Sequence, residues 1–396
     1  MITRVNKCRI CKHRKFDEIL SLGKQALTGV FPKNSFKKIL YAPLELIRCQ
    51  RCGLVQLRDS VKRELMYGES YGYRSGINQT MVQHLYDIAD EAQKRVELEP
   101  WDAVIDIGSN DCTLLHMYNP ELNRIGIDPL GKKFWEYYTH NIKIIPQYFS
   151  AKMLPKAKII TSIAMFYDLE DPMEFMREVK KTLHPDGVWV TEQSYMPTMV
   201  KRTAYDVICH EHLEYYGLRQ IKWMTDKLRL VIIDVSLNEC NGGSFRVTIA
   251  KNGIEATKKI DALLKREESI NFGAFAKRVD KHRTDLKMFL HKIVHEDKQT
   301  IMGYGASTKG NVILQYCGIG QYLRAVADRN PEKYGKVTPG TNVLIIPESR
   351  MRIQKPDYLL VLPYHFKEGF LSREQKFIAD GGKMIFPLPK LTVYPC

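Results

Sequence analysis

Short apolar runs alternate with amphipathic stretches over the central part of the chain, between about residues 80 and 255. The apolar runs lie at residues 103–107, 124–128, 159–165 and 188–192. Strands that alternate with helical segments predict a mainly parallel sheet of the α/β class. Two later runs, 230–235 and 244–250, flank Asn241-Gly242-Gly243, which predicts an antiparallel hairpin.

The C-terminal part repeats this alternation. A charged stretch of helical period, residues 255–296, leads to apolar runs at 301–305, 325–329, 358–363 and 383–387. Residues 1–70 are punctuated by Cys and Pro and predict a loop-like unit. A chain of 396 residues accommodates two or three domains that each bury a core. We therefore expect domains at 1–70, 71–255 and 256–396.

Two close-spaced cysteine pairs stand in the first domain, Cys8-x-x-Cys11 and Cys49-x-x-Cys52. Four thiolates in this spacing can surround zinc tetrahedrally, and Gly53 suits the tight turn after the second pair. Because sulfur would fill all four positions, the metal is expected to be structural. The alternative is four unrelated buried cysteines. The 37 residues between the pairs require a sizeable insertion.

A nucleoside-binding loop is predicted at residues 104–115, where an apolar strand ends at Asp106, turns at Gly108 and is expected to open a helix near Thr113. Backbone amides at a helix start beside a glycine hold polar groups of a nucleoside. Some 20 residues later a second predicted strand ends at Asp128, whose carboxylate can accept hydrogen bonds from ribose hydroxyls. The candidate cofactor contacts are Asp106, Gly108, Ser109, Asn110, Asp128 and Tyr73.

These signals fit either S-adenosylmethionine or a dinucleotide. A dinucleotide fingerprint needs three spaced glycines, and only Gly108 is present here. The loop therefore favours a class I, Rossmann-like methyltransferase domain. The alternative is a tight strand–helix turn of any α/β protein.

A second glycine-containing loop, Gly303-x-Gly305-x4-Gly310, follows a predicted strand and resembles a diphosphate-binding loop. Asn311 and Val312 replace the Lys-Ser/Thr of a Walker loop, so a nucleotide-sugar diphosphate fits better. The alternative is a ligand-free Rossmann-like remnant. The candidate contacts around this loop are Tyr304, Ser307, Thr308, Lys309, Asn311 and His365.

Other polar side chains follow the zinc block and the strand ends. Tyr71 and Tyr73 could bond an enolate oxygen, and a surface tyrosine loop is the alternative. Open α/β sheets bind ligands where their strands end. The remaining candidate substrate contacts are Arg74, Asn78, Gln193, Tyr195 and Asn241.

The densest titratable cluster is Cys209-His210-Glu211-His212. Histidine suits proton removal near neutral pH, and a neighbouring carboxylate can set its tautomer. The same residues could instead form a second metal site or a hydrogen-bonded loop. The spacing lacks the His-Glu-x-x-His register of zinc proteases, so we favour a base.

Taken in order, these motifs resemble the sugar C-methyltransferases of deoxysugar biosynthesis, of the tetronitrose and mycarose type. The resemblance spans nearly the whole chain. Besides the two cysteine pairs it covers Tyr71-Gly-Tyr-Arg-Ser-Gly-Ile-Asn78, Asp106-Ile-Gly-Ser-Asn-Asp111, Glu192-Gln-Ser-Tyr195, Cys209-His-Glu-His-Leu-Glu-Tyr-Tyr216, Asn241-Gly-Gly-Ser-Phe-Arg246 and Gly303-Tyr-Gly-Ala-Ser-Thr-Lys-Gly-Asn311.

The resemblance implies an N-terminal zinc-binding domain, a central S-adenosylmethionine domain and a C-terminal Rossmann-like domain that binds the nucleotide sugar. It also implies His212 as the base, assisted by Glu211, for methylation of carbon 3 of a 4-keto sugar. Two residues depart from the family. Cys112 stands where glycine is usual, and Cys209 stands where some members have tyrosine near the base.

The charge of the chain is compatible with a second function. The net charge is +15, and residues 1–80 carry 16 Lys and Arg against 6 acidic residues. This favours an anionic partner, so a nucleic-acid methyltransferase with a zinc-binding arm is the alternative. A scaffold whose cofactor loop is disabled at Cys112 is a third. The basic residues are scattered without interleaved aromatics, so no nucleic-acid partner is expected.

The sequence also bears on location. It has no apolar span or signal core, so we expect a cytoplasmic protein without membrane contact and with reduced cysteines. The pattern leaves monomer and homo-oligomer open.

Overall fold

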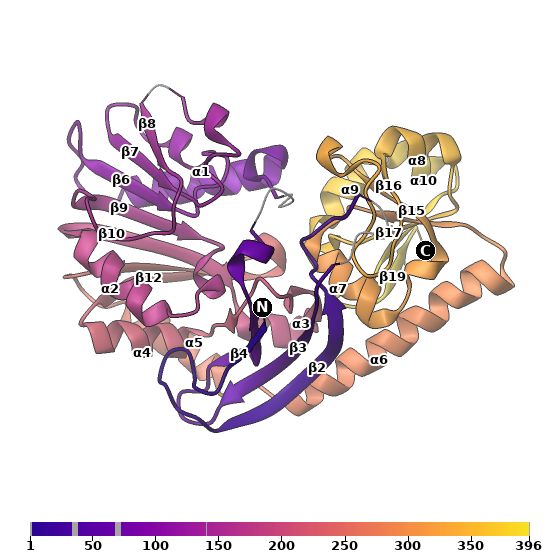
Figure 1. The fold of residues 1–396 in the computed structure, drawn as a ribbon, viewed down its shortest axis with the longest axis horizontal. Helices are drawn as coiled ribbons and strands as arrows, with labels where there is room; N and C mark the ends of the chain where they lie inside the picture. The colour runs from indigo at the N-terminus through magenta and orange to yellow at the C-terminus, as the bar shows by residue number, and fades with distance from the viewer. Residues whose placement is uncertain (1, 34–38, 68–72, 140, 396) are drawn as a thin grey trace.

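The computed structural model describes residues 2–33, 39–67, 73–139 and 141–395. A central α/β domain and a C-terminal α/β domain stand side by side, and a long N-terminal hairpin packs against both (Figure 1). No helix in these ranges combines the length and the apolar character needed to cross a bilayer.

The N-terminal domain is built on a four-stranded antiparallel sheet. Its strand order is β11-β4-β3-β2, with β2 at Phe16–Ala26, β3 at Tyr41–Cys49, β4 at Val55–Leu57 and β11 at Glu214–Tyr215. A smaller sheet pairs β1 (Ile2–Arg4) with β5 (Asp59–Val61). The expectation of a loop-like unit is therefore wrong. Two register shifts in β2 break the alternation of polar and apolar residues that would have indicated a strand.

The central domain has a seven-stranded sheet of order β12-β13-β10-β9-β6-β7-β8. All its strands are parallel except β13, which pairs antiparallel with both neighbours. The bounds are β6 Ala103–Ile107, β7 Asn123–Ile127, β8 Ile142–Ile145, β9 Ala157–Ile163, β10 Leu183–Ser194, β12 Val231–Asn238 and β13 Ser244–Ala250. The predicted alternation and the predicted antiparallel pair are both confirmed.

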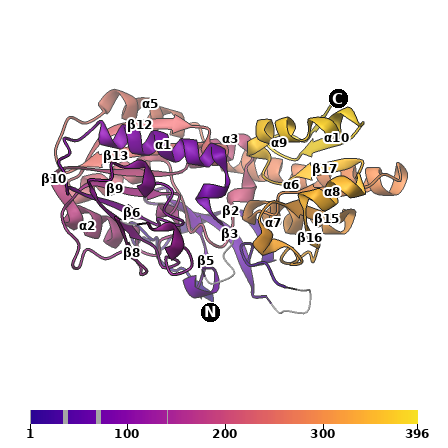
Figure 2. The same cartoon turned by 90° about the horizontal axis from the view of Figure 1, so that it is seen from above.

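Helices cover the central sheet. In the view of Figure 2, α1 lies over the sheet. It begins where Asn78 accepts a hydrogen bond from the Thr80 amide, and it buries a stripe of apolar residues at helical spacing. The helices of this part are α1 Gln79–Gln93, α2 Pro172–Thr182, α3 Met196–Arg202, α4 Leu218–Leu228 and α5 Thr257–Glu267.

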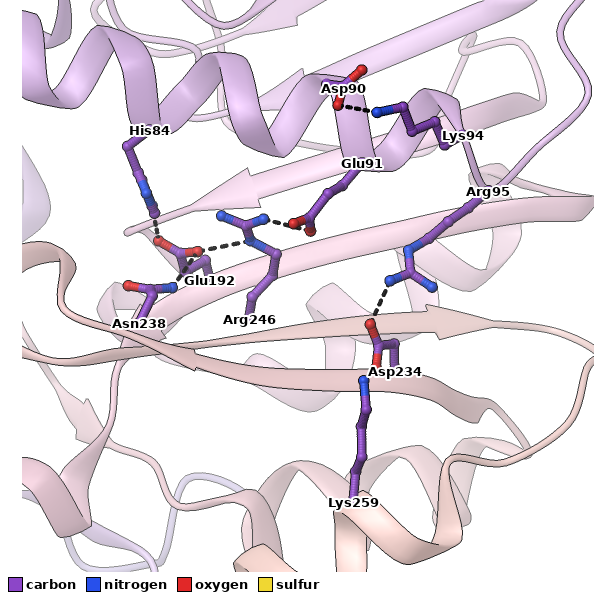
Figure 3. Close-up of polar contacts among 10 residues, drawn as sticks. All are labelled: His84, Asp90, Glu91, Lys94, Arg95, Glu192, Asp234, Asn238, Arg246 and Lys259. Carbon is purple, nitrogen blue, oxygen red and sulfur yellow. Dashed lines mark hydrogen bonds and ion pairs between the residues drawn. The ribbon is translucent and has the colours of Figure 1, made fainter.

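Ion pairs fasten α1 to the strands beneath it (Figure 3). The Glu192 carboxylate on β10 accepts from His84 of α1 and, at 2.9 Å, from Nε of Arg246 on β13. Arg246 also donates to Glu91 of α1 over 2.6 Å. Because Glu192 and Arg246 are both buried, their charges need these partners.

The C-terminal domain has a six-stranded sheet of order β16-β15-β14-β17-β18-β19, parallel except for β19. Its strands are β14 Ile301–Tyr304, β15 Leu323–Asp328, β16 Ile345–Pro347, β17 Tyr358–Val361, β18 Lys383–Phe386 and β19 Thr392–Tyr394. Its helices are α7 Thr308–Cys317, α8 Glu348–Gln354, α9 Lys367–Arg373 and α10 Gln375–Ala379. The connecting α6, Phe272–His291, runs along this domain (Figure 1).

One element of the cofactor loop differs from expectation. Instead of an α-helix opening near Thr113, only a single 3-10 turn, Leu115–Met117, follows the loop. Asn110 and Cys112 both have positive φ, at 49° and 66°, which interrupts a right-handed helix. Cys112 therefore occupies a left-handed position that glycine adopts more easily.

The junction between the N-terminal and central domains contains a buried charge cluster. The Arg9 guanidinium donates to Gln56 Oε1, to the Leu57 carbonyl at 2.8 Å and to Ser60 Oγ at 2.7 Å. Its Nε lies 3.5 Å from Glu214 Oε1, and both side chains are almost completely buried. Arg9 thus compensates a carboxylate in the strand that the central domain contributes to the N-terminal sheet.

Replacing Arg9 by alanine should destabilise the protein by about 3–5 kcal/mol, because Glu214 would remain buried without a cation. Urea unfolding measures this. Arg14→Ala, at an exposed arginine of the same domain, is the matched control and should change stability by less than about 0.5 kcal/mol. Equal stability of the two variants would show that Arg9 does not support the junction.

Candidate active site and zinc site

The four cysteines of the two pairs converge. All four Sγ atoms lie within 4.8 Å of one another, and Cys8–Cys52 and Cys11–Cys49 are each 3.5 Å apart. A tetrahedron with Zn–S bonds of about 2.3 Å has S–S edges of roughly 3.8 Å. The cluster therefore fits zinc, and since sulfur occupies every position, zinc would brace the fold.

The two halves of the cluster have the same local geometry. After the first pair Lys12 has φ 60° and donates its amide to the Cys8 carbonyl at 3.0 Å. After the second, Gly53 has φ 72° and donates to the Cys49 carbonyl at 3.0 Å. The β2–β3 hairpin is the insertion that separates the pairs.

A cavity of about 620 Å³ opens where β6, β7 and β9 end. This is the point at which the strand order reverses, where open α/β sheets bind ligands. Three of the predicted cofactor contacts, Gly108, Asn110 and Asp128, line it. Asp128 Oδ2 accepts from the Asn110 amide at 2.8 Å, and Oδ1 accepts from the Leu130 amide at 2.7 Å. The carboxylate is thus fixed beside the cavity.

Several lining residues of this cavity were not predicted. They are Arg63, Glu64, Tyr67, Gln147, Tyr148, Phe149, Met165, Asp168 and Glu170, among others. The apolar run at 142–145, followed by Pro146 and Gln147, was a strand-end signal that could have indicated part of this set. The residues from 63 to 67 carry no such signal, because they reach the cavity only through the packing of the N-terminal domain.

A second cavity, of about 80 Å³, adjoins the first at Asn110 and Ala164. It is lined by Tyr73, Asp106, Ser109, Gln193 and Asn241, all of them predicted site residues. Gln193 is buried, and its Oε1 accepts from Thr191 Oγ1 at 3.0 Å. Its Nε2 has no hydrogen-bond partner among the described residues, so it can donate to a ligand.

His212 lines a small space together with Tyr167 and Ser194, and these two residues also line the second cavity. Its Nδ1 lies 2.8 Å from the Val207 carbonyl. A carbonyl only accepts, so Nδ1 carries the proton and Nε2 has a free lone pair. Burial, reinforced by the positive charge of Lys309, lowers the pKa of His212 to about 3, which keeps the ring neutral.

Glu211 is not the partner of His212. The buried Glu211 carboxylate accepts from Thr28 Oγ1 at 3.3 Å, in the N-terminal domain. The tautomer of His212 is set by Val207 instead. His210 bonds to the Ala42 carbonyl at 3.1 Å, so the two histidines engage different partners and do not form a shared metal site.

The C-terminal domain contributes to the same region. Lys309 Nζ donates to the Asn241 carbonyl at 2.9 Å, and the Lys309 charge acts on both His212 and His365. His365 packs close to the turn that contains Asn241, since a Cβ added to Gly242 would lie 3.8 Å from His365 Cβ. Asn241, His212, Lys309 and His365 are therefore brought together from four separate segments of the chain.

A third cavity, of about 190 Å³, lies between the loop after residue 73 and the ends of β14, β15 and β17. Four of the residues predicted as substrate contacts, Arg74, Asn78, Tyr304 and Ser307, line it. Tyr73 lines both this cavity and the second one. A single elongated ligand could therefore extend from one to the other past Tyr73.

Some predicted contacts are placed elsewhere. Asn311 is fully buried and donates to the Thr28 carbonyl at 2.7 Å, so it joins two domains and cannot reach a diphosphate. Tyr195 is buried and donates to Glu267 at 2.9 Å. Thr308 lies beside Gly29. Ser307 does line the third cavity, but its Oγ also caps α7 by accepting from the Gly310 amide at 3.0 Å. Tyr71 falls outside the described residues.

A further group, His84, Glu192 and Cys240, has ligand atoms within 4.8 Å of one another and lines the second cavity (Figure 3 shows the first two). Burial opposes a charge on His84, but its bonds to Cys240 and Glu192 raise its pKa to about 10. Protonated His84 and Arg246 already compensate Glu192. We interpret the group as a charge cluster that fixes α1 and not as a metal site.

Comparison with known families gives three matches in chain order. Residues 8–67 match a zinc binding domain, residues 72–235 a methyltransferase domain, and residues 239–389 a C-methyltransferase C-terminal domain. A curated relative, the C-methyltransferase NovU of Streptomyces niveus, is 27% identical over 98% of this chain and 97% of its own.

Two solved methyltransferase structures are similar to less than half of the chain. A methyltransferase in complex with the Haloferax volcanii Trm112 activator is 15% identical, with a TM-score of 0.36 over 45% of this chain and 95% of its own. An S-adenosylmethionine-dependent methyltransferase from Aquifex aeolicus is 15% identical, with a TM-score of 0.33 over 43% of this chain and 97% of its own. Nothing about substrate follows from likenesses of this size.

The parallel sheet, the strand-end cavity with Asp128, and the family matches define an S-adenosylmethionine-dependent methyltransferase. In chain order the protein carries the zinc binding domain, the methyltransferase domain and the C-methyltransferase C-terminal domain, and its four-cysteine cluster lies in the first of them. Over nearly its whole length it is similar to a curated C-methyltransferase, which agrees with the motif resemblance.

Purified protein should contain one zinc per chain, and Cys49→Ser should lose most of it. Loss of a structural metal removes several kcal/mol, so Tm should fall by on the order of 5–10 °C. Elemental analysis and a melting curve measure both effects. Cys240→Ser, in the His84 group, is the control and should keep its zinc. A zinc content unchanged in the Cys49 variant would refute this assignment.

Asp128→Asn should weaken binding of S-adenosylhomocysteine by roughly 1–3 kcal/mol, because a charged acceptor for the ribose hydroxyls is lost. Calorimetry measures the affinity. The exposed Asp186→Asn in the same domain is the matched control and should bind normally. An Asp128 variant with wild-type affinity would mean that the ribose lies elsewhere.

Proposed function

We propose that this C-methyltransferase methylates carbon 3 of a 4-keto-deoxysugar linked to a nucleotide, through an enolate. S-adenosylmethionine, bound in the 620 Å³ cavity, would supply an electrophilic methyl group. Carbon becomes a nucleophile only after a proton beside a carbonyl is removed, so the reaction needs a base and a stabilised oxyanion.

The observation that carries this proposal is the state of His212. Its Nδ1–H is bonded to the Val207 carbonyl, so the lone pair of Nε2 is available to accept a proton. We assign to Nε2 the removal of the proton on carbon 3. The electron pair of that C–H bond would move into the enolate, and carbon 3 would then take the methyl group. The methyl–sulfur bond would break and S-adenosylhomocysteine would leave, with the abstracted proton on His212 until solvent accepts it.

Two side chains are suited to the oxyanion. The buried Nε2 of Gln193 lacks a partner among the described residues and can donate to the former 4-keto oxygen. The Tyr73 hydroxyl is the second donor that we assign, since Tyr73 lines the same cavity. Donors fixed before the reaction stabilise developing charge without reorganisation.

We assign the nucleotide part of the substrate to the 190 Å³ cavity because of the charges that line it. Four basic residues line it, Arg74, Arg329, Lys333 and Arg373, against two acidic ones, Asp328 and Glu348. The excess of positive charge suits a diphosphate. Tyr73 separates this cavity from the second one, so the diphosphate would lie on one side and the sugar ring on the other.

His212→Asn should reduce methylation of a 4-keto-sugar nucleotide by roughly 100- to 10,000-fold, the usual contribution of a general base. It should also abolish exchange of the carbon 3 proton with deuterated solvent when S-adenosylhomocysteine replaces the methyl donor. Exchange requires the base but no methyl transfer. Mass spectrometry of the sugar nucleotide reads both reactions.

His184→Asn, at a partly exposed histidine of the same domain that lines none of these cavities, is the matched control and should retain both reactions. Calorimetry with S-adenosylhomocysteine verifies that the His212 variant is folded. Proton exchange at the wild-type rate in that variant would exclude His212 as the base. Failure of the wild type to methylate any 4-keto-sugar nucleotide would exclude the substrate class.

A further inference from the structure

The C-terminal domain repeats the ribose-binding geometry of the methyltransferase domain. In the central domain, Asp128 follows β7, its Oδ2 accepts from the Asn110 amide at 2.8 Å, and its Oδ1 accepts from the Leu130 amide at 2.7 Å. In the C-terminal domain, Asp328 ends β15. Its Oδ2 accepts from the Ala306 amide at 2.7 Å, and its Oδ1 accepts from the Asn330 amide at 2.7 Å.

The glycine turns before these acids also correspond. Gly108 has φ 78° and donates its amide to the Ile127 carbonyl at 2.8 Å. Gly305 has φ 84° and donates to the Ala327 carbonyl at 2.7 Å. In both domains the loop after the first strand therefore crosses the end of the second, and it holds the carboxylate of that second strand by a backbone amide.

An acid at the end of the second strand of such a unit is placed to bind ribose hydroxyls. The Asp328 side chain is 12% exposed and lines the 190 Å³ cavity, so its oxygens are accessible from that cavity. Its two amide bonds use only part of the acceptor capacity of a carboxylate, which has about four lone-pair sites. Room remains for hydroxyl donors.

We propose that Asp328 binds the nucleoside half of the substrate by accepting hydrogen bonds from the hydroxyl groups of its pentose. This inference rests on the proposed function, and it adds a binding residue and an orientation. The pentose would lie at Asp328 and the sugar to be methylated beyond Tyr73. The diphosphate would lie between them, beside Arg74.

The neighbours of Asp328 fit this orientation. Lys333 Nζ donates to the Ala306 carbonyl at 2.7 Å and lies 3.7 Å from Asp328 Oδ2. The hydrogen bond to Ala306 therefore keeps the ammonium group of Lys333 beside the Asp328 carboxylate. Arg373 pairs with Glu348 at 3.6 Å, whereas Arg74 pairs with Asp111 at 3.2 Å on the side of the central domain. Cationic groups thus line both ends of the path that the diphosphate would take.

The test uses nucleoside diphosphates without the sugar, so it does not depend on turnover. UDP, CDP, GDP and TDP are titrated into the full-length protein by calorimetry, and the tightest is compared with its 2′,3′-dideoxy analogue. Asp328→Asn is titrated with the same pair. Asp380→Asn, at an exposed aspartate of the same domain, is the matched control.

In the wild type and the control, loss of the pentose hydroxyls should weaken binding about 10- to 100-fold, as for a hydrogen bond to a charged group. Asp328→Asn should weaken the parent diphosphate similarly, and it should bind the parent and the dideoxy form almost equally. Its affinity for S-adenosylhomocysteine should stay unchanged, since Asp128 holds that nucleoside.

Equal binding of parent and dideoxy diphosphates by the wild type would overturn the role of Asp328 while leaving a nucleotide substrate in place. Wild-type affinity of the Asp328 variant for the parent would do the same. Absence of binding by all four diphosphates would overturn the nucleotide site itself, and with it the proposed substrate. The dideoxy comparison needs no variant, so it decides the question even if Asp328→Asn misfolds.

Discussion

The pairing of β11 with β4 is the constraint on which the active site depends. Glu214 and Tyr215 of the central domain extend the sheet of the zinc-binding domain, and the Leu57 amide donates to the Leu213 carbonyl at 2.9 Å. His212 is the residue just before this anchored segment. Arg9 compensates Glu214, Thr28 binds Glu211, and the cysteine cluster fixes the strands that hold them. The zinc-binding domain thus orients the histidine from outside the methyltransferase fold.

The same packing arranges the cavities in a series. The 620 Å³ and 80 Å³ cavities share Asn110 and Ala164, and the 80 Å³ and 190 Å³ cavities share Tyr73. The N-terminal and central domains line the 620 Å³ cavity together, and the central and C-terminal domains line the 190 Å³ cavity together. Apolar cores also run across the domain boundaries. The groups to which we assign the reaction therefore meet where the domains join, and a shift of one domain against another would separate them.

Much of this could be predicted from local patterns. The strand-end acids, the glycine turns and the paired cysteines are local signals, and Asp128, Gly108 and the Cys8–Cys52 cluster lie where those signals placed them. The prediction was wrong where tertiary context decides. The β2–β3 hairpin carries bulges, and Asn110 and Cys112 interrupt the expected helix. The buried Asn311 bonds to the Thr28 carbonyl, 283 residues away in the sequence. The role of Val207 in setting the tautomer of His212 has no sequence signature, since any residue supplies a carbonyl.

The late arrival of β11 also bears on synthesis of the chain. During translation β4 is the edge strand of the N-terminal sheet until residues 214–215 are synthesised, some 150 residues after β4. During that interval β4 presents an unpaired edge, which can pair with other chains. Closing a loop of this length makes the contact slow to form. A nascent chain held short of residue 213 should therefore depend on chaperones, and the zinc-binding domain alone is a poor unit for recombinant expression.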